Sequence, residues 1–116
     1  MSRTVCLAAN CIGYPEGGGH LWVYLNWALG LRALGCRVTW MERVGGTFFG
    51  SPVCVDGKIY AVSNLGEVDV IDGGAEFKVL ARNQLGEASH ATPAISGGIM
   101  YLRTVSHLIS VGGKKP

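Results

Sequence analysis

The sequence predicts an α+β fold in which a short βαβ unit precedes about seven antiparallel strands. Two observations support this prediction. Residues 4–44 contain an apolar run, a glycine-rich loop, a long apolar segment and a second apolar run, which is the order strand, loop, helix, strand. A pattern with closely spaced turn residues then occurs twice in residues 51–113. We therefore divide the chain into two predicted domains, 1–44 and 45–116.

The first domain begins with a predicted buried strand, Thr4 to Ala9, and the loop CIGYPEGGG. The stretch from His20 to Leu34 is long enough for about four helical turns, and it ends at Gly35, a residue type that suits the C′ position. CRVTWME then predicts a second strand. Because parallel strands require a crossover helix, this domain is predicted to be a Rossmann-like βαβ unit.

The predicted helix is apolar almost all round, since His20, Asn26 and Arg32 are its only strongly polar residues. Such a helix is expected to be buried on most sides, either by the rest of the chain or by another copy. It is shorter than a membrane span, which needs roughly 18 to 20 apolar residues. The first apolar run is also shorter than the core of a secretory signal. We therefore expect a cytoplasmic protein with no membrane partner.

The glycine loop and the end of the second strand supply the weak candidate ligand-binding residues: Gly17, Gly18, Gly19, His20 and Glu42. Glycines let backbone N–H groups approach an anion at a helix N-terminus. Glu42 lies about 20 residues beyond the loop, where a dinucleotide site places its ribose-binding acid. The GxGxxG fingerprint fails, because its third glycine would fall at Trp22. Turn geometry alone is the alternative for the glycines, and a helix residue without chemistry is the alternative for His20.

The phrase GGGHLWVYLNWALGLRALGCRVTWME resembles the start of the N-terminal domain of GT-B type glycosyltransferases, over residues 4–44. The resemblance implies that the glycine loop, Gly17 to Gly19 with His20, faces a cleft that approaches donor or acceptor. In that family a second domain holds the nucleotide-sugar, and residues 45–116 contain no counterpart to it. We therefore expect no catalytic residues here, although sugar or nucleotide-sugar binding at the loop is the alternative function.

The second domain contains the segment SPVCVDGKIYAVSNLGEVDVID and a weaker copy, TPAISGGIMYLRTVSHLISVGG. We expect one register without a gap, because like residues recur 41 positions apart: Pro52 and Pro93, Gly57 and Gly98, Tyr60 and Tyr101, Val70 and Val111. A period of roughly 40 to 45 residues is typical of four-stranded propeller blades. The two copies therefore predict one and three-quarter β-propeller blades.

Turn residues delimit the predicted strands of each copy. Asp56 with Gly57 suits a type I′ hairpin turn, and Gly66 suits the left-handed position of the next turn. The stretch FKVLARNQL predicts a fourth, outermost strand of the first copy. In the second copy two glycines replace the first turn, whereas Ser106 and His107 occupy the second. The second copy has three predicted strands, which gives seven in total.

The phrases SPVCVDGKIYAVSNLGEVDVID and ATPAISGGIMYLRT resemble quinoprotein-like (PQQ-type) β-propeller repeats, over residues 50–113. The resemblance implies a scaffold or binding platform. Members that bind the quinone use tryptophan docking motifs at the end of the fourth strand, and the matching stretch FKVLARNQL has no tryptophan. We therefore expect no cofactor. His90 and His107 could line a cleft, but no acid or nucleophile is paired with them in the sequence, and a structural role is the alternative.

Composition excludes several functional classes. The formal net charge is +2 and the basic residues are dispersed, so no nucleic-acid partner is expected. The four cysteines form no CxxC pair, and their spacing with His20 does not fit a zinc finger or ribbon, so no metal site is expected.

The leading interpretation is a fusion of two fragments, whether natural or derived from gene assembly, that acts at most as a non-catalytic interaction fold. Fewer than two blades cannot close a ring, so the outer strands are predicted to expose unpaired backbone groups. We therefore expect self-association, or association with another protein, through open sheet edges. The exposed side chains of the helix are expected to add to this tendency.

Overall fold

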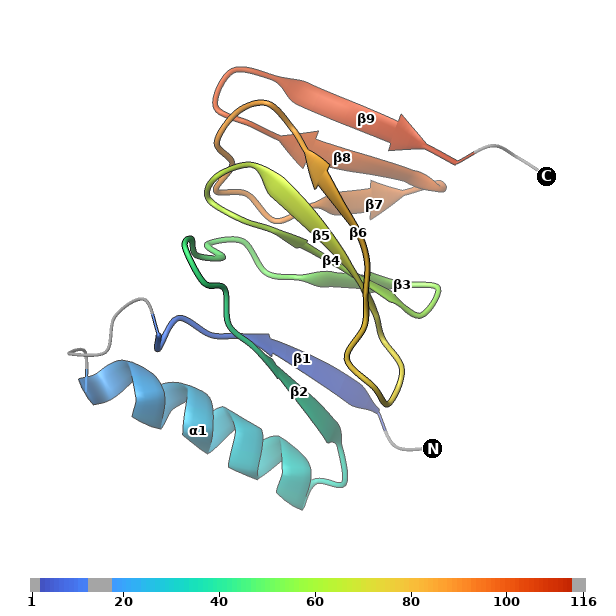
Figure 1. Ribbon diagram of the computed structural model, residues 1–116. Coiled ribbons are helices and arrows are strands. Elements are labelled where there is room, and N and C mark those ends of the chain that lie inside the picture. The colour runs from blue at the N-terminus through green and yellow to red at the C-terminus, as the bar shows by residue number, and fades with distance from the viewer. Residues whose placement is uncertain (1–2, 13–17, 114–116) are drawn as a thin grey trace. The chain divides into compact units, whose positions relative to one another are not determined.

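The computed structural model describes residues 3–12 and 18–113 (Figure 1). The chain forms two compact units, Met1–Thr47 and Phe48–Pro116. In chain order the elements are β1 (Thr4–Ala8), α1 (Gly18–Ala33), β2 (Arg37–Met41), β3 (Val53–Val55), β4 (Lys58–Val62), β5 (Glu67–Asp72), β6 (Val79–Gln84), β7 (Ala94–Ser96), β8 (Ile99–Arg103) and β9 (Leu108–Gly112). One helix and two antiparallel sheets in the described residues confirm the predicted α+β class.

In the first unit, β1 and β2 pair in parallel, from Thr4 opposite Arg37 to Ala8 opposite Met41, and α1 connects them. The helix ends in a Schellman motif, because the N–H of Gly35 bonds to the carbonyl of Arg32 and that of Cys36 to the carbonyl of Leu31. Gly35 has φ 81°, a left-handed conformation that glycine adopts without strain.

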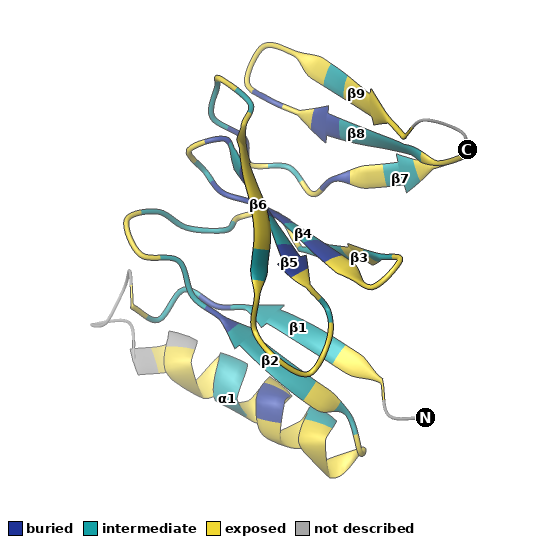
Figure 2. Cartoon of the chain, turned by 45° about the vertical axis from the view of Figure 1, so that its right-hand side comes forward, coloured by how far each residue is buried: buried dark blue, intermediate teal, exposed yellow. Residues whose placement is uncertain are grey.

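Only a narrow face of α1 packs on the two strands. The ring of Tyr24 meets that of Trp40 edge to face, with centroids 5.9 Å apart, and Ala28 is buried. Most other large side chains of the helix are exposed in the chain, among them Leu21, Trp22, Val23, Trp27 and Leu29. Figure 2 colours most of α1 as exposed. The two strands of the same unit therefore do not provide the burial on most sides that the composition of the helix predicted.

The second unit contains two antiparallel sheets, in the orders β3-β4-β5-β6 and β7-β8-β9. The seven strands follow one another as a meander, as the repeat predicted. The first hairpin of each copy is closed by a two-residue turn. Asp56 and Gly57 have φ 48° and 70°, and Gly97 and Gly98 have φ 58° and 78°. Positive φ at both central residues is the signature of the predicted type I′ turn.

The two sheets share a hydrophobic core. Val62, Val68 and Leu102 are its buried members, and partly buried hydrophobic residues pack against them: Tyr60, Leu85, Met100 and Ile109. Val62 pairs with Val68 in the first sheet, and Leu102 pairs with Ile109 in the second. Because directly opposed residues share a face, one face of each sheet builds this core.

The second hairpin of each copy differs by one residue, so the expectation of one register without a gap is wrong. Val70 pairs with Tyr60 in the first copy, whereas Tyr101 pairs with Ser110 in the second. The structural counterpart of Val70 is therefore Ser110 and not Val111. A one-residue slip moves side chains to the opposite face of a sheet. Val111 accordingly shares a face with Met100.

Positions 41 residues apart meet where the two copies begin. The N–H of Ser51 donates to Oγ1 of Thr92 over 2.8 Å. The rings of Phe49 and His90 lie edge to face, with centroids 5.1 Å apart. Equivalent residues of the two copies are thus neighbours at the start of their first strands.

Candidate functional site

The predicted glycine loop lies only partly in the described residues. Gly17 falls outside them, and α1 begins at Gly18. Gly19 is exposed, and a Cβ added to it would meet nothing within 4 Å. His20 lies in the first turn of α1, which contains no acidic residue. This helix end can therefore accept negative charge.

Glu42 lies just beyond β2 and is held by donors of the chain itself. Its carboxylate accepts the N–H of Cys11 at 3.0 and 3.1 Å, the N–H of Ile12 at 3.3 Å and Nε1–H of Trp40 at 3.2 Å. The parallel pairing of β1 and β2 places the loop after β1 beside the end of β2. A carboxylate has about four lone-pair sites. These contacts therefore occupy the lone pairs that would otherwise accept hydrogen bonds from the hydroxyl groups of a ribose.

The Cys11 thiol lies in the same arrangement. Burial raises the pKa of Cys11, and the charge of Glu42 and a hydrogen bond to it raise the pKa further. A thiol kept protonated is a poor nucleophile. The geometry around Glu42 therefore favours an anchor for the loop after β1.

A second polar cluster, which the sequence did not predict as a site, lies at the turn between β8 and β9. Oε1 of Glu87 is 2.5 Å from Oγ of Ser106 and 2.7 Å from Nδ1 of His107, and the N–H of Ser106 donates to Oε2 over 3.0 Å. The N–H of His107 also donates to Oγ1 of Thr104, over 3.1 Å. The Ser106–His107 pair marked this turn as unlike that of the first copy, but no local pattern identified Glu87.

These contacts lower the pKa of Glu87 from its ordinary value of 4.5 to about 2. The hydroxyl of Ser106 contributes most, followed by the N–H of Ser106 and the side chain of Thr104, with a smaller effect from His107. A carboxylate that accepts several hydrogen bonds is stabilised in its charged form. Glu87 thus fastens the β8–β9 turn as an anion.

The cluster contains serine, histidine and glutamate but lacks the geometry of a hydrolytic triad. Oγ of Ser106 is 3.0 Å from Nδ1 of His107, and Glu87 contacts that same ring nitrogen. A triad uses one nitrogen for the nucleophile and the other for the orienting acid. The arrangement therefore stabilises a turn and does not activate the serine.

Glu87→Gln is expected to flatten the dependence of stability on acidic pH. Because the pKa of Glu87 is depressed in the folded chain, its stabilising contribution is present above about pH 4.5 and is lost as pH falls toward about 2. Urea unfolding at several pH values between 5 and 2 should show the wild type losing more stability than Glu87→Gln. Glu76→Gln removes the same charge from an exposed position and is the control. Parallel curves for wild type and Glu87→Gln would contradict the anchoring role.

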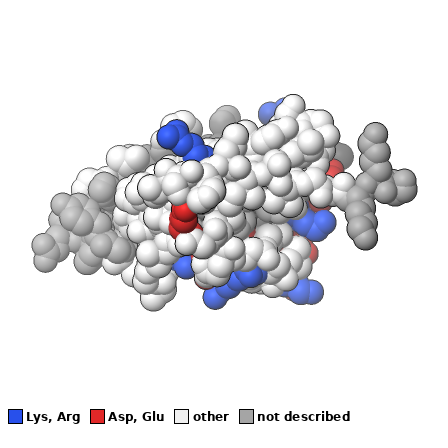
Figure 3. Space-filling model, turned by 90° about the horizontal axis from the view of Figure 1, so that it is seen from above, with Lys and Arg blue, Asp and Glu red and all other residues white. Residues whose placement is uncertain are grey.

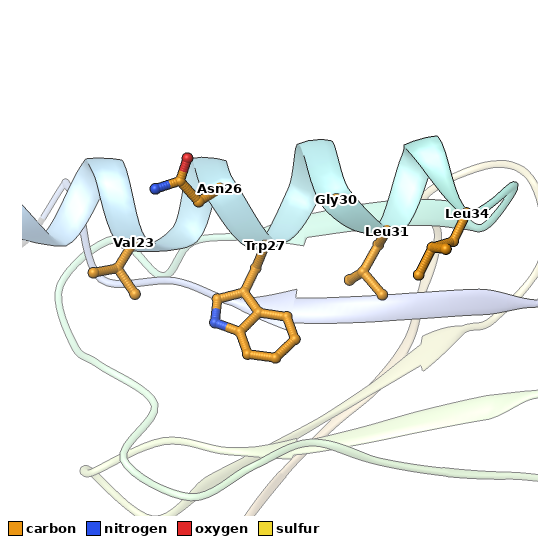
Figure 4. Close-up of a pocket in the computed structure, with 6 residues that line it drawn as sticks. All are labelled: Val23, Asn26, Trp27, Gly30, Leu31 and Leu34. Atoms are coloured by element: carbon orange, nitrogen blue, oxygen red, sulfur yellow. The ribbon is translucent and has the colours of Figure 1, made fainter.

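An apolar groove of about 440 Å³ lies along the exposed side of α1. Its lining residues belong to the helix or directly follow its last residue: Val23, Asn26, Trp27, Gly30, Leu31 and Leu34. Figure 4 shows Val23, Trp27, Leu31 and Leu34 pointing to the same side, while Asn26 points away from them. Spacings of three and four residues place side chains on one helix face. The groove offers apolar contact with few polar groups to orient a ligand.

A smaller groove of about 280 Å³ lies in the second unit and is lined by His90, Ala91, Arg103, Thr104 and Val105. Arg103 is the charged side chain among them. The His90 ring is held by its contact with Phe49. The sequence indicated His90 and His107 as possible cleft residues, and the structure places His90 on this groove and His107 in the Glu87 cluster.

Within residues 3–12 and 18–113, no three His, Cys, Asp or Glu side chains are grouped so that they could hold a metal ion. On the face shown in Figure 3, Lys and Arg side chains are separated by uncharged surface. Among the described residues, no helix combines the length and apolar character that crossing a bilayer requires.

Comparison with known proteins assigns no family, since neither a family model nor a curated protein matches the chain. Among solved structures, the protein Ph1500 of Pyrococcus horikoshii matches at 10% identity and a TM-score of 0.37. The match covers 67% of this chain and 56% of that protein. The chain therefore spans little more than half the length of this structural neighbour.

Proposed function

We propose that this chain is a non-catalytic interaction module, in which residues 48–113 are successive units of a β-propeller-type repeat. The contact between positions 41 residues apart carries the proposal. Ser51 bonds to Thr92, and Phe49 packs on His90. Repeats that stack in one sense bring equivalent residues together and bury one face of each unit against the next. The shared core of Val62, Val68 and Leu102 fits this arrangement.

In the described residues, one face of the β7-β8-β9 sheet points away from the core that it shares with the first sheet. Ala94, Tyr101 and Ser110 are paired across β7, β8 and β9, and therefore share the face that points away from the core. Leu108 belongs to this face through its pairing with Arg103, and 72% of its surface is exposed. Such a sheet is a platform for a protein partner, and the proposal gives no role to nucleic acid, membrane or cofactor.

The proposal retains the first unit as a segment similar to the start of GT-B type glycosyltransferases, fused to the repeat. The self-contained hydrogen bonding of Glu42 and the geometry of the Glu87 cluster both favour a module without chemistry. The alternative is sugar or nucleotide-sugar binding at Gly17 to Gly19. It is favoured by one observation, the absence of acidic residues in the first turn of α1.

Titration with nucleotide-sugars separates the two functions. We expect no heat of binding and no turnover with UDP-glucose or GDP-mannose, because no nucleophile or base accompanies the loop in the described residues. Gly18→Ala and Gly19→Ala serve as matched variants. Sugar transfer by the wild type that these substitutions abolish would overturn the interaction module in favour of the alternative.

A further inference from the structure

The outer edge of β9 lacks the residues that usually protect a sheet edge. β9 pairs with β8 on one side and ends the order β7-β8-β9 within the described residues (Figure 1). Its sequence, Leu-Ile-Ser-Val-Gly, contains no charge and no proline. Figure 2 colours most of it as exposed. Natural edge strands normally carry charges, proline or bulges that discourage pairing with another chain.

The first copy shows what a protected edge looks like in this chain. Its outer strand β6 reads Val-Leu-Ala-Arg-Asn-Gln, and its last five residues are exposed. Its pairing with β5 includes a register shift between Val70 and Ile71. The structural counterpart of β9 is not this outer strand but β5, which is paired on both sides. β9 thus has the composition of an interior strand in an edge position.

The charge pattern indicates which strand fits beside β9. In the first sheet, Arg82 of β6 is paired with Asp69 of β5, and their side chains approach to 3.3 Å. The position in β9 equivalent to Asp69 is Ile109, since Leu102 pairs with Ile109 where Ala61 pairs with Asp69. A strand with the charges of β6 would find no acid on β9. An uncharged strand fits better, and β9 of a second copy is such a strand.

The hydrogen-bond alternation of the hairpin fixes which backbone groups face outward. The N–H of Thr104 bonds to the carbonyl of His107, so these two residues form a hydrogen-bonded pair. Pairs alternate along an antiparallel ladder, so Ile109 and Val111 direct their backbone groups toward β8. Leu108, Ser110 and Gly112 therefore direct theirs to the open side.

We propose that two copies of this chain associate through β9, antiparallel about a two-fold axis at Ser110. Ser110 then pairs with Ser110 of the second copy, and Leu108 pairs with Gly112 on either side of it. Ile109 lies opposite Val111, a β-branched pair of the kind that stabilises neighbouring strands. The two three-stranded sheets become one sheet of six strands. The inference rests on the proposed interaction role and names its partner.

Charge substitutions at the two-fold axis test this pairing. Sedimentation velocity of the wild-type chain, from about 1 to 200 μM, should show a reversible equilibrium of monomer and dimer. Ser110→Lys places two like charges directly opposite each other and should raise the dissociation constant at least about tenfold. Ser110→Glu should do the same. An equimolar mixture of the two variants should restore a dimer that contains one copy of each.

Val105→Lys is the matched control, because Val105 is 74% exposed in the same hairpin but lies outside β9. It should leave the dimer unchanged. The far-UV circular dichroism of each variant verifies that the fold is retained. A wild type that remains monomeric over this range would overturn the β9 pairing while leaving the absence of turnover, and with it the proposed function, intact. A dimer that Trp27→Glu abolishes and Ser110→Lys does not would place the interface on α1 instead.

Discussion

Gly66→Ala is expected to lower the free energy of unfolding by about 3 kcal/mol or more. Gly66 has φ 79°, a left-handed conformation that alanine adopts only with strain. A Cβ at this position would also overlap the carbonyl oxygen of Glu87, which is backbone and cannot rotate away. Its own carbonyl accepts the N–H of Leu85, so the turn is fixed on both sides. Urea unfolding monitored by tryptophan fluorescence and circular dichroism measures the loss.

Gly57→Ala isolates the effect of backbone strain from the effect of steric overlap. Gly57 has φ 70°, but a Cβ there would meet nothing within 4 Å. It should cost only about 1 kcal/mol, from the left-handed conformation alone. Equal losses for the two variants would show that the loop after β6 does not approach the β4–β5 turn as closely as the structure describes.

Leu102→Ala is expected to cost about 3 kcal/mol, the usual loss for a buried leucine. Leu102 is 5% exposed and contributes the second sheet's buried side chain to the core that Val62 and Val68 build from the first. The substitution leaves a cavity between the two sheets and should loosen both copies of the repeat together. Thermal or urea unfolding measures this effect.

Leu65→Ala is the control for the core, because Leu65 is 56% exposed in the β4–β5 turn. A surface substitution of this kind should change stability by no more than about 0.5 kcal/mol. If Leu102→Ala lowered the free energy of unfolding as little as Leu65→Ala does, the two sheets would not share a core. The proposed stacking of the two copies would then be contradicted as well.

The local turn chemistry of this chain could be predicted from its sequence. Asp56 with Gly57 and the glycine pair of the second copy predicted type I′ turns, because glycine has no Cβ and aspartate tolerates positive φ better than most residues. Gly35 predicted the helix end, and the repeat with its closely spaced turn residues predicted all seven strands. These features depend on a few neighbouring residues, so a sequence pattern is sufficient to reveal them.

The features that depend on contacts between distant residues could not be predicted from the sequence. The β8–β9 hairpin is one residue tighter than its counterpart, and it is fastened by Glu87, 19 residues before Ser106. The tighter hairpin places Ser110, and not Val111, at the position that matches Val70. Glu42 was predicted as a ribose ligand from its place after a strand, yet donors 30 and 31 residues away surround it. The spacing correctly predicted that Glu42 lies at the end of the second strand. It could not show that the carboxylate oxygens already accept hydrogen bonds from the chain itself.

Amide exchange along β9, measured by NMR at two protein concentrations, tests most directly whether this chain acts through its open sheet edge. The account predicts that the amides of Leu108, Ser110 and Gly112 become protected as the concentration rises from about 5 to 200 μM. Those of Ile109 and Val111 face β8 and should be protected equally at both concentrations. Fast, concentration-independent exchange at Leu108, Ser110 and Gly112 would contradict the account.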